Sequence, residues 1–299
     1  MTASINYIRY KGFKIVKRYR NCHNEVYKVK DENSHYMIIK TNGDEKSKDL
    51  LKNEIKWLEK RQQLEDTLNI KLPNLIKSEI YKGQIFLIIA YIDGFSLKQI
   101  LLKGDLDECY IVKLAEFTDR IKKLRYIDTM RSHGKKELSF EEWDKVFLDN
   151  LKKWHSDIIR NSSNRIRVLI DTLYEKAKDF HTEDAGLGGI HGSAKLDEFI
   201  YDDKEDLYVL DWERASSVYI NFYQTASIAS YFLIRLRQKD LTNKFLSERE
   251  KLLNKSQYIT YKGNFHKILS QRILGDIWDL TQEGDIESVS GLNIKEFIN

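Results

Sequence analysis

The stretch GGIHGSAKLDEFIYDDKEDLYVLDWERAS, residues 188–216, decides the fold. Two short runs rich in Phe, Ile, Tyr, Leu and Val predict a pair of β-strands, with a loop before the first strand. Polar side chains that chemistry can use flank both strands. The stretch therefore raises the question whether His191-Gly192-Ser193 begins a catalytic loop or the remains of one.

The composition is that of a soluble globular protein. The chain has 299 residues, of which 41% are hydrophobic and 32% are charged, so it can bury a full core in one large domain or in two lobes. The N-terminus shows no apolar segment long enough for a signal peptide, and the longest apolar run, IFLIIAYI at 85–92, is much shorter than a membrane span. These features predict a cytoplasmic protein without membrane contact.

The charge pattern does not favour a nucleic-acid partner. The net charge is only +4, from 50 basic and 46 acidic residues. The stretch RIKKLRYIDTMRSHGKK at 120–136 carries seven Lys or Arg residues, and we interpret it as a solvated helix face and loop. It is at most a weak indication that a partner is anionic. Cys22 and Cys109 lie far apart and lack C-x-x-C spacing, so we assign them no role.

The chain changes character near residue 92. Before it, short alternating runs predict strands, which one helix interrupts. The strands are EVYKVK from Glu25, YMIIKT from Tyr36, SEIYKG from Ser78 and QIFLIIAYI from Gln84, and the helix starts at Ser47. After Gly94, long amphipathic segments predict helices, two of them with capping boxes at Ser139-x-x-Glu142 and Ser247-x-x-Glu250. We therefore expect an α+β protein of the two-lobed protein kinase-like fold, with a small β-rich lobe at 1–92 and a larger helical lobe at 93–299 that carries the strand pair.

Residues of the β-rich lobe fit a nucleotide site. Lys40 closes a strand, and Glu54 lies on the helix, where a carboxylate that faces the sheet can meet the ammonium. Such a pair holds the lysine against the α- and β-phosphates of a nucleotide, although a solvated ion pair is the alternative. The apolar strand that ends at Ala90-Tyr91-Ile92 suits a hinge whose backbone binds an adenine edge, and the alternative is a plain strand followed by a turn.

The sequence resembles the aminoglycoside phosphotransferase and choline kinase group of kinase-like enzymes. The blocks NEVYKV, IIKT, NEIKWLEK, LIIAYIDGFSL and IHGSAKLDEFIYDDKEDLYVLDWE occur in that family's order between Asn24 and Glu213, and the last block is the specific one. The resemblance implies binding of ATP and Mg²⁺. It also implies that Lys40 anchors phosphate, that Glu54 is its partner, and that Asp211 binds the metal.

The chain departs from the family in the catalytic loop. Ser193 stands where the family has Asp, which accepts or orients the proton of the substrate hydroxyl, and Glu198 stands where it has a metal-binding Asn. Glu198 precedes Asp211 by 13 residues, the separation that the family's two metal ligands usually show, and a carboxylate is a good ligand for Mg²⁺. A serine hydroxyl cannot take up a proton near neutral pH, so general-base help of about 10²–10⁴ in rate is expected to be lost.

Three neighbours of Ser193 complete the expected loop. His191 is expected to pack inward and order the segment. Lys195 either contacts the transferred phosphate or faces solvent. Asp197 is the nearest alternative base, but beside Glu198 on an extended segment it would point to the opposite face. The family's glycines are also missing from RNCHNEVYK at 20–28, and its further acidic residue has no clear counterpart after 213.

These features leave three functions open. The first is an ATP- and Mg²⁺-dependent phosphotransferase that acts on a hydroxyl of a small molecule, with an anionic or neutral acceptor because of the basic stretch at 120–136. The second is a pseudokinase that binds nucleotide, or only a partner protein, as a regulatory module. The third is a kinase-fold enzyme that catalyses a different transfer, such as nucleotidyl transfer. Ser193 is the residue that separates them.

Overall fold

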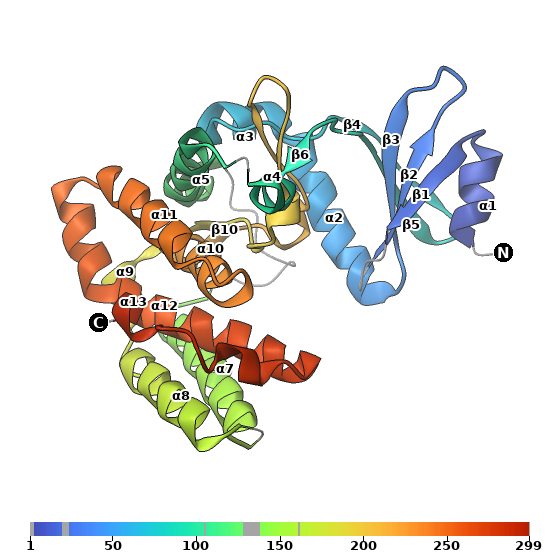
Figure 1. The fold of residues 1–299 in the computed structure, drawn as a ribbon. Helices are drawn as coiled ribbons and strands as arrows, with labels where there is room; N and C mark the ends of the chain where they lie inside the picture. The colour runs from blue at the N-terminus through green and yellow to red at the C-terminus, as the bar shows by residue number, and fades with distance from the viewer. Residues whose placement is uncertain (1–2, 20–23, 105, 128–137, 161, 299) are drawn as a thin grey trace. The chain divides into compact units, whose positions relative to one another are not determined.

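The computed structural model describes residues 3–19, 24–104, 106–127, 138–160 and 162–298, and they form two compact units (Figure 1). The described residues of Met1–Leu106 and Leu196–Ala215 belong to the first unit, and those of Asp107–Lys195 and Ser216–Asn299 belong to the second. The first unit thus extends beyond the lobe expected at 1–92, because it also includes the described residues of 93–106 and the strand pair after residue 196.

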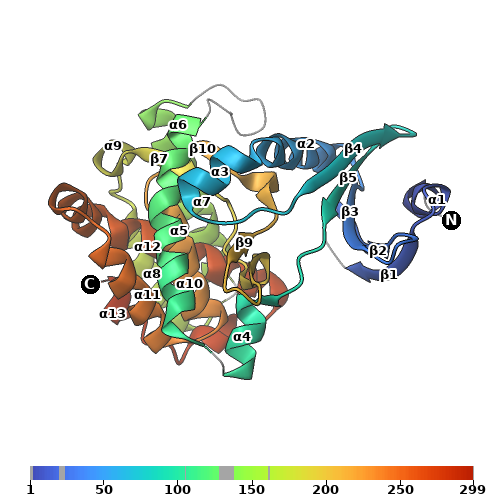
Figure 2. The same cartoon turned by 90° about the horizontal axis from the view of Figure 1, so that it is seen from above.

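A five-stranded antiparallel sheet with strand order β1-β2-β3-β5-β4 is the centre of the first unit. The strands are β1 (Lys14–Tyr19), β2 (Asn24–Lys30), β3 (Tyr36–Asn42), β4 (Leu75–Tyr81) and β5 (Gln84–Ala90). Helix α1 (Ala3–Tyr10) lies on one face of the sheet and helix α2 (Glu45–Glu59) on the other (Figure 2). The strands therefore bury side chains on both faces.

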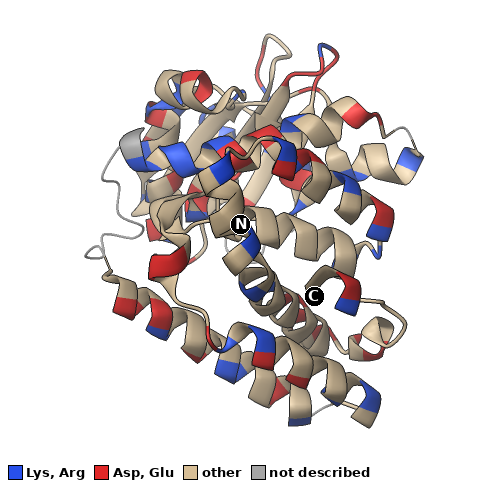
Figure 3. Ribbon diagram, turned by 90° about the vertical axis from the view of Figure 1, so that its left-hand side faces the viewer, with Lys and Arg blue, Asp and Glu red and all other residues tan. Residues whose placement is uncertain are grey.

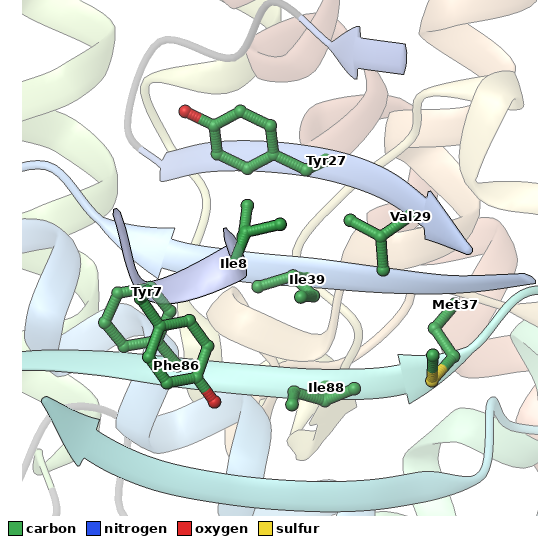
Figure 4. Packing of buried hydrophobic residues seen from close by; sticks show 8 residues of the cluster. All are labelled: Tyr7, Ile8, Tyr27, Val29, Met37, Ile39, Phe86 and Ile88. Atoms are coloured by element: carbon green, nitrogen blue, oxygen red, sulfur yellow. The ribbon is translucent and has the colours of Figure 1, made fainter. Parts of the chain in front are cut away.

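The pleat of the sheet separates a structural face from a face that carries Lys40. Successive side chains of a strand point to opposite faces. The α1 face is packed by apolar side chains of the central strands together with two residues of α1 (Figure 4), namely Tyr7, Ile8, Tyr27, Val29, Met37, Ile39, Phe86 and Ile88. On the other face, the register places Val26 opposite Lys40 and Lys40 opposite Leu87.

Helix α1 corrects the sequence analysis, which expected only strands and one helix in this region. Its eight residues, ASINYIRY, alternate apolar and polar at Ile5 and Tyr7, a pattern that imitates a strand. A helix this short depends on tertiary contacts. Tyr7 stacks on Phe86 with a ring-centroid distance of 3.8 Å and donates a hydrogen bond to Glu79, and Ser4 donates to Glu25.

The predicted helix at Ser47 is two helices. Helix α2 begins at Glu45, because Asp44 accepts a hydrogen bond from the backbone N–H of Ser47 at 2.7 Å and the Ser47 hydroxyl accepts from the Asp44 N–H at 2.9 Å. This capping box fixes the first turn. The chain ends α2 at Glu59 and continues as α3 (Arg61–Leu68).

The strand pair of the opening stretch is present. A 3₁₀ turn η3 (Leu196–Glu198) precedes β8 (Phe199–Tyr201), which pairs with β9 (Leu207–Val209) and with β6 (Phe95–Ser96). β6 leads into α4 (Leu97–Lys103). A Cβ at Gly94 would lie 2.4 Å from the carbonyl oxygen of Tyr201, so the close approach of these two segments requires glycine.

Helices dominate the second unit, as the sequence predicted. They are α5 (Glu108–Arg120), η1 (Ile121–Lys123), α6 (Leu124–Ile127), α7 (Phe140–Arg160), α8 (Asn164–Ala177), α9 (Thr182–Ala185), α10 (Tyr223–Ser230), η5 (Tyr231–Arg235), α11 (Lys239–Lys251), α12 (Lys255–Glu283), η6 (Ile286–Val289) and α13 (Lys295–Ile298). One antiparallel pair, β7 (Leu187–Ile190) with β10 (Ser216–Ile220), belongs to this unit.

One of the two predicted capping boxes is confirmed. The Ser139 hydroxyl accepts from the backbone N–H of Glu142 at 3.2 Å, and the Glu142 carboxylate accepts from the Ser139 N–H at 2.7 Å, just before α7. The box at Ser247 is wrong, because α11 runs through it from Lys239 to Lys251. The motif alone does not distinguish the start of a helix from its interior.

Two surface properties bear on the expected partners. Lys and Arg are interspersed with Asp and Glu on the helices (Figure 3). In the basic stretch at 120–136, Nζ of Lys122 lies 2.6 Å from Oδ1 of Asp119, and Nη2 of Arg120 lies 3.6 Å from Oε2 of Glu116. Residues 128–136 lie outside the described part of the chain. None of the helices in the described part is long and apolar enough to cross a membrane.

Candidate nucleotide and metal site

The expected ion pair of Lys40 is present in the first unit, with an additional partner. The ammonium of Lys40 lies 2.7 and 3.0 Å from the two carboxylate oxygens of Glu54 and 2.9 Å from Oδ1 of Asp211. Lys40 is 8% exposed and Glu54 is 1% exposed. Strand β3, helix α2 and the turn after β9 therefore meet at one buried ammonium.

Burial and neighbouring charge act on this pair in opposite directions. Burial by itself lowers the pKa of Lys40, but the carboxylates of Asp211 and Glu54 outweigh it, so the pKa is raised and the ammonium stays charged. Burial raises the pKa of Glu54 to about 7, against the attraction of Lys40, and the nearby carboxylates of Asp211 and Glu213 add to the rise. The group of carboxylates thus carries more negative charge than Lys40 balances.

Asp211 adopts an unusual backbone conformation that directs its side chain. Its φ of 63° and ψ of 55° are left-handed, a region that Asp enters more readily than most residues. The chain turns here from β9 into η4 (Trp212–Arg214). Trp212 is fully buried, and its indole N–H donates to the carbonyl oxygen of Val209 at 2.9 Å, so the turn is held from the core side.

Helix α2 binds this turn through two residues that flank Glu54. The side-chain amide of Asn53 donates to the carbonyl oxygens of Glu213 and Ala215, both at 3.0 Å. The indole N–H of Trp57 donates to the Ala215 carbonyl at 3.2 Å. These bonds hold the helix and the turn together, so the contact of Lys40 with Glu54 and Asp211 is preformed. The sequence analysis missed both residues.

A third carboxylate lies next to Asp211. Ligand atoms of Glu54, Asp211 and Glu213 all lie within 4.8 Å of one another. Glu213 is 4% exposed, and its Oε2 accepts a hydrogen bond from the side-chain amide of Asn24 at 2.7 Å. Glu198, the expected partner of Asp211 in metal binding, is not among these three residues.

The structure places Glu198 close to Asp211 along the backbone. The carbonyl oxygen of Glu198 accepts from the N–H of Leu210 at 2.9 Å, and Glu198 itself is 8% exposed. The expectation of an extended segment at Asp197 is wrong, because Asp197 and Glu198 lie in the 3₁₀ turn η3. Asp197 is exposed and pairs with Lys98 at 3.1 Å.

The backbone at the expected hinge is partly occupied. The N–H of Ala90 donates to the carbonyl oxygen of Asn74 at 2.9 Å, and the N–H of Tyr91 donates to that of Tyr36 at 3.4 Å. These two donors are therefore committed to the sheet and its neighbouring loop. An adenine edge at this strand end would use the carbonyl group of Ala90 or the backbone of Ile92.

The loop that begins at His191 belongs to the second unit and is ordered there by one side chain. The Oε1 atom of Gln224 accepts from the backbone N–H groups of His191 and Gly192 at 3.1 and 3.2 Å, and its Nε2 donates to the carbonyl oxygen of Ser193 at 2.6 Å. His191 is fully buried, with its ring 6.2 Å from that of Phe117. Gln224 lies in NFYQTAS, where the sequence analysis found no functional signal.

The side chains that follow in this loop lie near the surface. The hydroxyl of Ser193, which is half-buried, accepts from the backbone N–H of Lys195 at 3.3 Å. Lys195 is exposed. Residues 20–23 of the stretch RNCHNEVYK, which include Cys22, lie outside the described residues.

Comparisons with known proteins show the fold. No family model matches the sequence, and a search of the curated proteins finds no match. The structure is similar to the GDP complex of an aminoglycoside 2′-phosphotransferase mutant, with a TM-score of 0.67, 12% identity and coverage of 99% of this chain and 92% of that chain. It is also similar to a thermostable mutant of an aminoglycoside phosphotransferase in apo form, with a TM-score of 0.64, 11% identity and coverage of 99% and 98%.

An amicoumacin kinase in complex with AMP-PNP and Ca²⁺ matches with a TM-score of 0.64, 14% identity and coverage of 100% of this chain and 91% of that chain. The chain therefore has the α+β, protein kinase-like fold that its sequence predicted. The sequence identity to these structures is low, so the comparisons show the fold. The chemistry depends on the residues of this chain.

Proposed function

We propose that this protein is an ATP-dependent phosphotransferase that acts on a hydroxyl group of a small molecule. The observation that carries the proposal is the ammonium of Lys40, which Glu54 and Asp211 hold at 2.7 and 2.9 Å on the face of the sheet opposite the α1 cluster. A lysine fixed in this way is positioned to contact nucleotide phosphates. The complexes of similar structures with GDP and AMP-PNP support a nucleotide ligand.

The same sheet face supplies apolar walls for a base. Val26 and Leu87 flank Lys40 in the register, and Ile38 and Ile89 are paired two residues further along the same strands. Leu87 and Ile89 are buried, and Val26 and Ile38 are half-buried. Apolar walls with a few fixed polar groups are typical of small-molecule sites. The backbone at Ala90 and Ile92 would then bind the edge of the base.

The acidic residues fit a divalent cation. Carboxylate oxygens are the ligands that Mg²⁺ prefers, and we propose Asp211 as one ligand. The second carboxylate comes either from Glu198, as the sequence predicts, or from Glu213, which lies in the same cluster as Asp211. Mg²⁺, when bound, would neutralise negative charge on the phosphates during transfer. Asp211 also accepts a hydrogen bond from Lys40, so this residue would connect the phosphate anchor to the metal site.

The loop around Ser193 favours a second candidate, a pseudokinase that binds nucleotide or a partner protein as a regulatory module. Ser193 lacks a carboxylate, and the alternative base Asp197 is exposed and paired with Lys98. Lys195, by contrast, favours the phosphotransferase, because its exposed side chain can contact a transferred phosphate. Because phosphoryl transfer depends mainly on positioning and charge neutralisation, slow transfer can persist without a base.

Calorimetric titration of the protein with ATP and Mg²⁺ tests nucleotide binding. We expect the wild type to bind, Lys40→Ala to lose about tenfold or more in affinity, since charge-assisted hydrogen bonds are worth about 1.5–3 kcal/mol, and Lys14→Ala to bind like the wild type. Lys14 is the matched control, because it is an exposed lysine on β1 of the same sheet. No binding by the wild type at millimolar ATP would rule the proposal out.

A screen of hydroxyl acceptors with labelled ATP then separates the phosphotransferase from the pseudokinase.

A further inference from the structure

In the part of the chain that the structure describes, three largely buried carboxylates gather around Asp211 and the ammonium of Lys40. The carboxylates of Glu54, Asp211 and Glu213 approach one another within 4.8 Å, and Lys40 supplies one positive charge to the first two. Arg214 lies 3.8 Å from Glu213, but its side chain is 52% exposed and hence largely hydrated. A buried excess of negative charge is unfavourable unless a cation compensates it. A cation bound by these carboxylates would therefore be favourable.

Asn24 gives a second and independent indication. It is 3% exposed and lies at the start of β2. Its Nδ2 donates to Oε2 of Glu213 at 2.7 Å, while its Oδ1 is buried and has no hydrogen-bond partner in the part of the chain that the structure describes. A buried amide oxygen without a partner is costly. Because it belongs to the same amide group that contacts Glu213, it lies beside the acidic cluster.

Within the cluster, Glu54 is the residue least suited to bind a metal. Both of its carboxylate oxygens accept hydrogen bonds from Lys40, at 2.7 and 3.0 Å. Asp211 and Glu213 are separated by one residue, Trp212, which is fully buried. The left-handed backbone of Asp211 turns the chain so that the carboxylates on both sides of the tryptophan lie within 4.8 Å of each other.

We propose that Asp211 and Glu213, with the amide oxygen of Asn24, form a divalent-cation site. Carboxylate and amide oxygens are ligands that Mg²⁺, Mn²⁺ and Ca²⁺ all accept. Glu213 and Asn24 are thereby assigned as metal ligands, which the sequence analysis did not do. The role of the cation in this site rests on the proposed function. The three ligands all belong to the first unit, so the cation can bind in the absence of nucleotide.

Titration of the nucleotide-free protein with Mn²⁺, followed by the electron paramagnetic resonance of the free ion, tests the site. Loss of one ligand or of its support usually weakens metal binding by about 10–100-fold. We therefore expect Glu213→Gln to lose at least about tenfold in affinity for Mn²⁺, and Glu198→Gln, the matched change at the other candidate ligand, to lose less. The reverse order would assign the metal to Glu198 and overturn the proposal.

Asn24→Asp distinguishes a metal ligand from a merely structural residue. It replaces the amide by a carboxylate of the same shape, which repels Glu213 in the absence of a cation and adds a charged ligand in its presence. We expect a melting temperature below that of the wild type in chelator, recovery of most of the difference with Mn²⁺, and Mn²⁺ binding at least as tight as in the wild type. An equal loss of melting temperature with and without Mn²⁺ would show that Asn24 only holds Glu213 in place.

Two outcomes separate this proposal from the proposed function. If the wild type binds Mn²⁺ and Glu213→Gln does not, but ATP does not bind, then the cation site stands and the phosphotransferase fails. If ATP binds with the same affinity in chelator and in Mg²⁺, and no Mn²⁺ binds at millimolar concentration, then the cation site fails and nucleotide binding stands.

Discussion

The side chain of Gln224 holds the backbone of Ser193. Its Nε2 donates to the Ser193 carbonyl oxygen at 2.6 Å, and its Oε1 accepts from the two preceding backbone N–H groups, of His191 and Gly192, at 3.1 and 3.2 Å. Helix α10 thus fixes the loop through main-chain atoms alone. The Ser193 side chain adds the contact of its hydroxyl with the N–H of Lys195 at 3.3 Å, so a side chain that keeps this acceptor can replace it while the loop persists.

Gln224→Ala is expected to lower the free energy of unfolding by about 1–3 kcal/mol, because it leaves buried backbone groups without partners. Gln224→Glu keeps the shape but loses the donor to Ser193. Buried and facing a carbonyl oxygen, the new carboxyl should have a pKa above its value in the unfolded chain, so the variant is most stable at low pH and loses stability as pH rises. Denaturant unfolding at several pH values measures both effects. A pH-independent loss in Gln224→Glu would contradict the assigned hydrogen bonds.

The shared ammonium of Lys40 predicts a strong coupling with Glu54. Lys40→Met leaves buried carboxylates without their cation and should cost about 3–5 kcal/mol of stability. Adding Glu54→Gln removes one of these carboxylates, so the double variant should recover part of the loss. Unfolding free energies of the wild type, both single variants and the double variant form the cycle. Strictly additive effects would mean that the pair does not interact in solution.

Glu79 predicts a loss of stability in acid. The Lys77 ammonium at 2.8 Å, the hydroxyl of Tyr7 and the Lys11 ammonium at 2.9 Å lower the pKa of this carboxyl to about 2. A depressed pKa stabilises the fold above the unfolded value of 4.5, and this contribution disappears as pH falls from there towards 2. Because Lys77 is half exposed and screened by water, the contribution is about 1–2 kcal/mol.

Glu79→Gln should therefore flatten the dependence of stability on pH between 5 and 2. The measurement is the difference in unfolding free energy between wild type and variant at each pH. Glu45→Gln is the matched control, since the Glu45 side chain is 86% exposed and its contact with Lys48 is only a surface pair. A parallel pH profile for wild type and Glu79→Gln would show that Glu79 does not fasten α1 to the sheet.

The sequence predicted those features that local patterns encode. The strands around Lys40, the hairpin before Asp211 and the long helices follow from periodicity, and the structure confirms them. Helix α1 was missed because its two core residues, Tyr7 and Ile8, are specified by packing on Phe86 rather than by a helical repeat in eight residues. Local pattern carried little information there.

The candidate site was predictable only for the residues with a recognisable motif. Lys40, Glu54 and Asp211 could be named from the order of the blocks. Asn24 and Glu213 are 189 positions apart, and no spacing rule indicates that they bond. The same holds for Gln224, whose role appears only when α10 brings it to the loop. Contacts of this kind are set by the tertiary fold.

Restoring the missing acid at position 193 tests whether the loop is a lapsed kinase loop. In Ser193→Asp, the new carboxylate can still accept from the N–H two residues further on, as the Ser193 hydroxyl does from Lys195 at 3.3 Å, and Gln224 still binds the backbone carbonyl. The loop should therefore keep its conformation. Under the proposed function the added charge would lie near the γ-phosphate, so affinity for ATP should change little or fall slightly, while turnover should rise by about 10-fold or more. The measurement is the turnover of labelled ATP with a hydroxyl acceptor by the wild type, Ser193→Asp and Ser193→Ala.

One outcome would contradict the pseudokinase hypothesis. If the wild type already turns over the acceptor at a rate typical of kinases, about 1–100 s⁻¹, and Ser193→Ala leaves that rate unchanged, then another group is the base and the pseudokinase hypothesis fails.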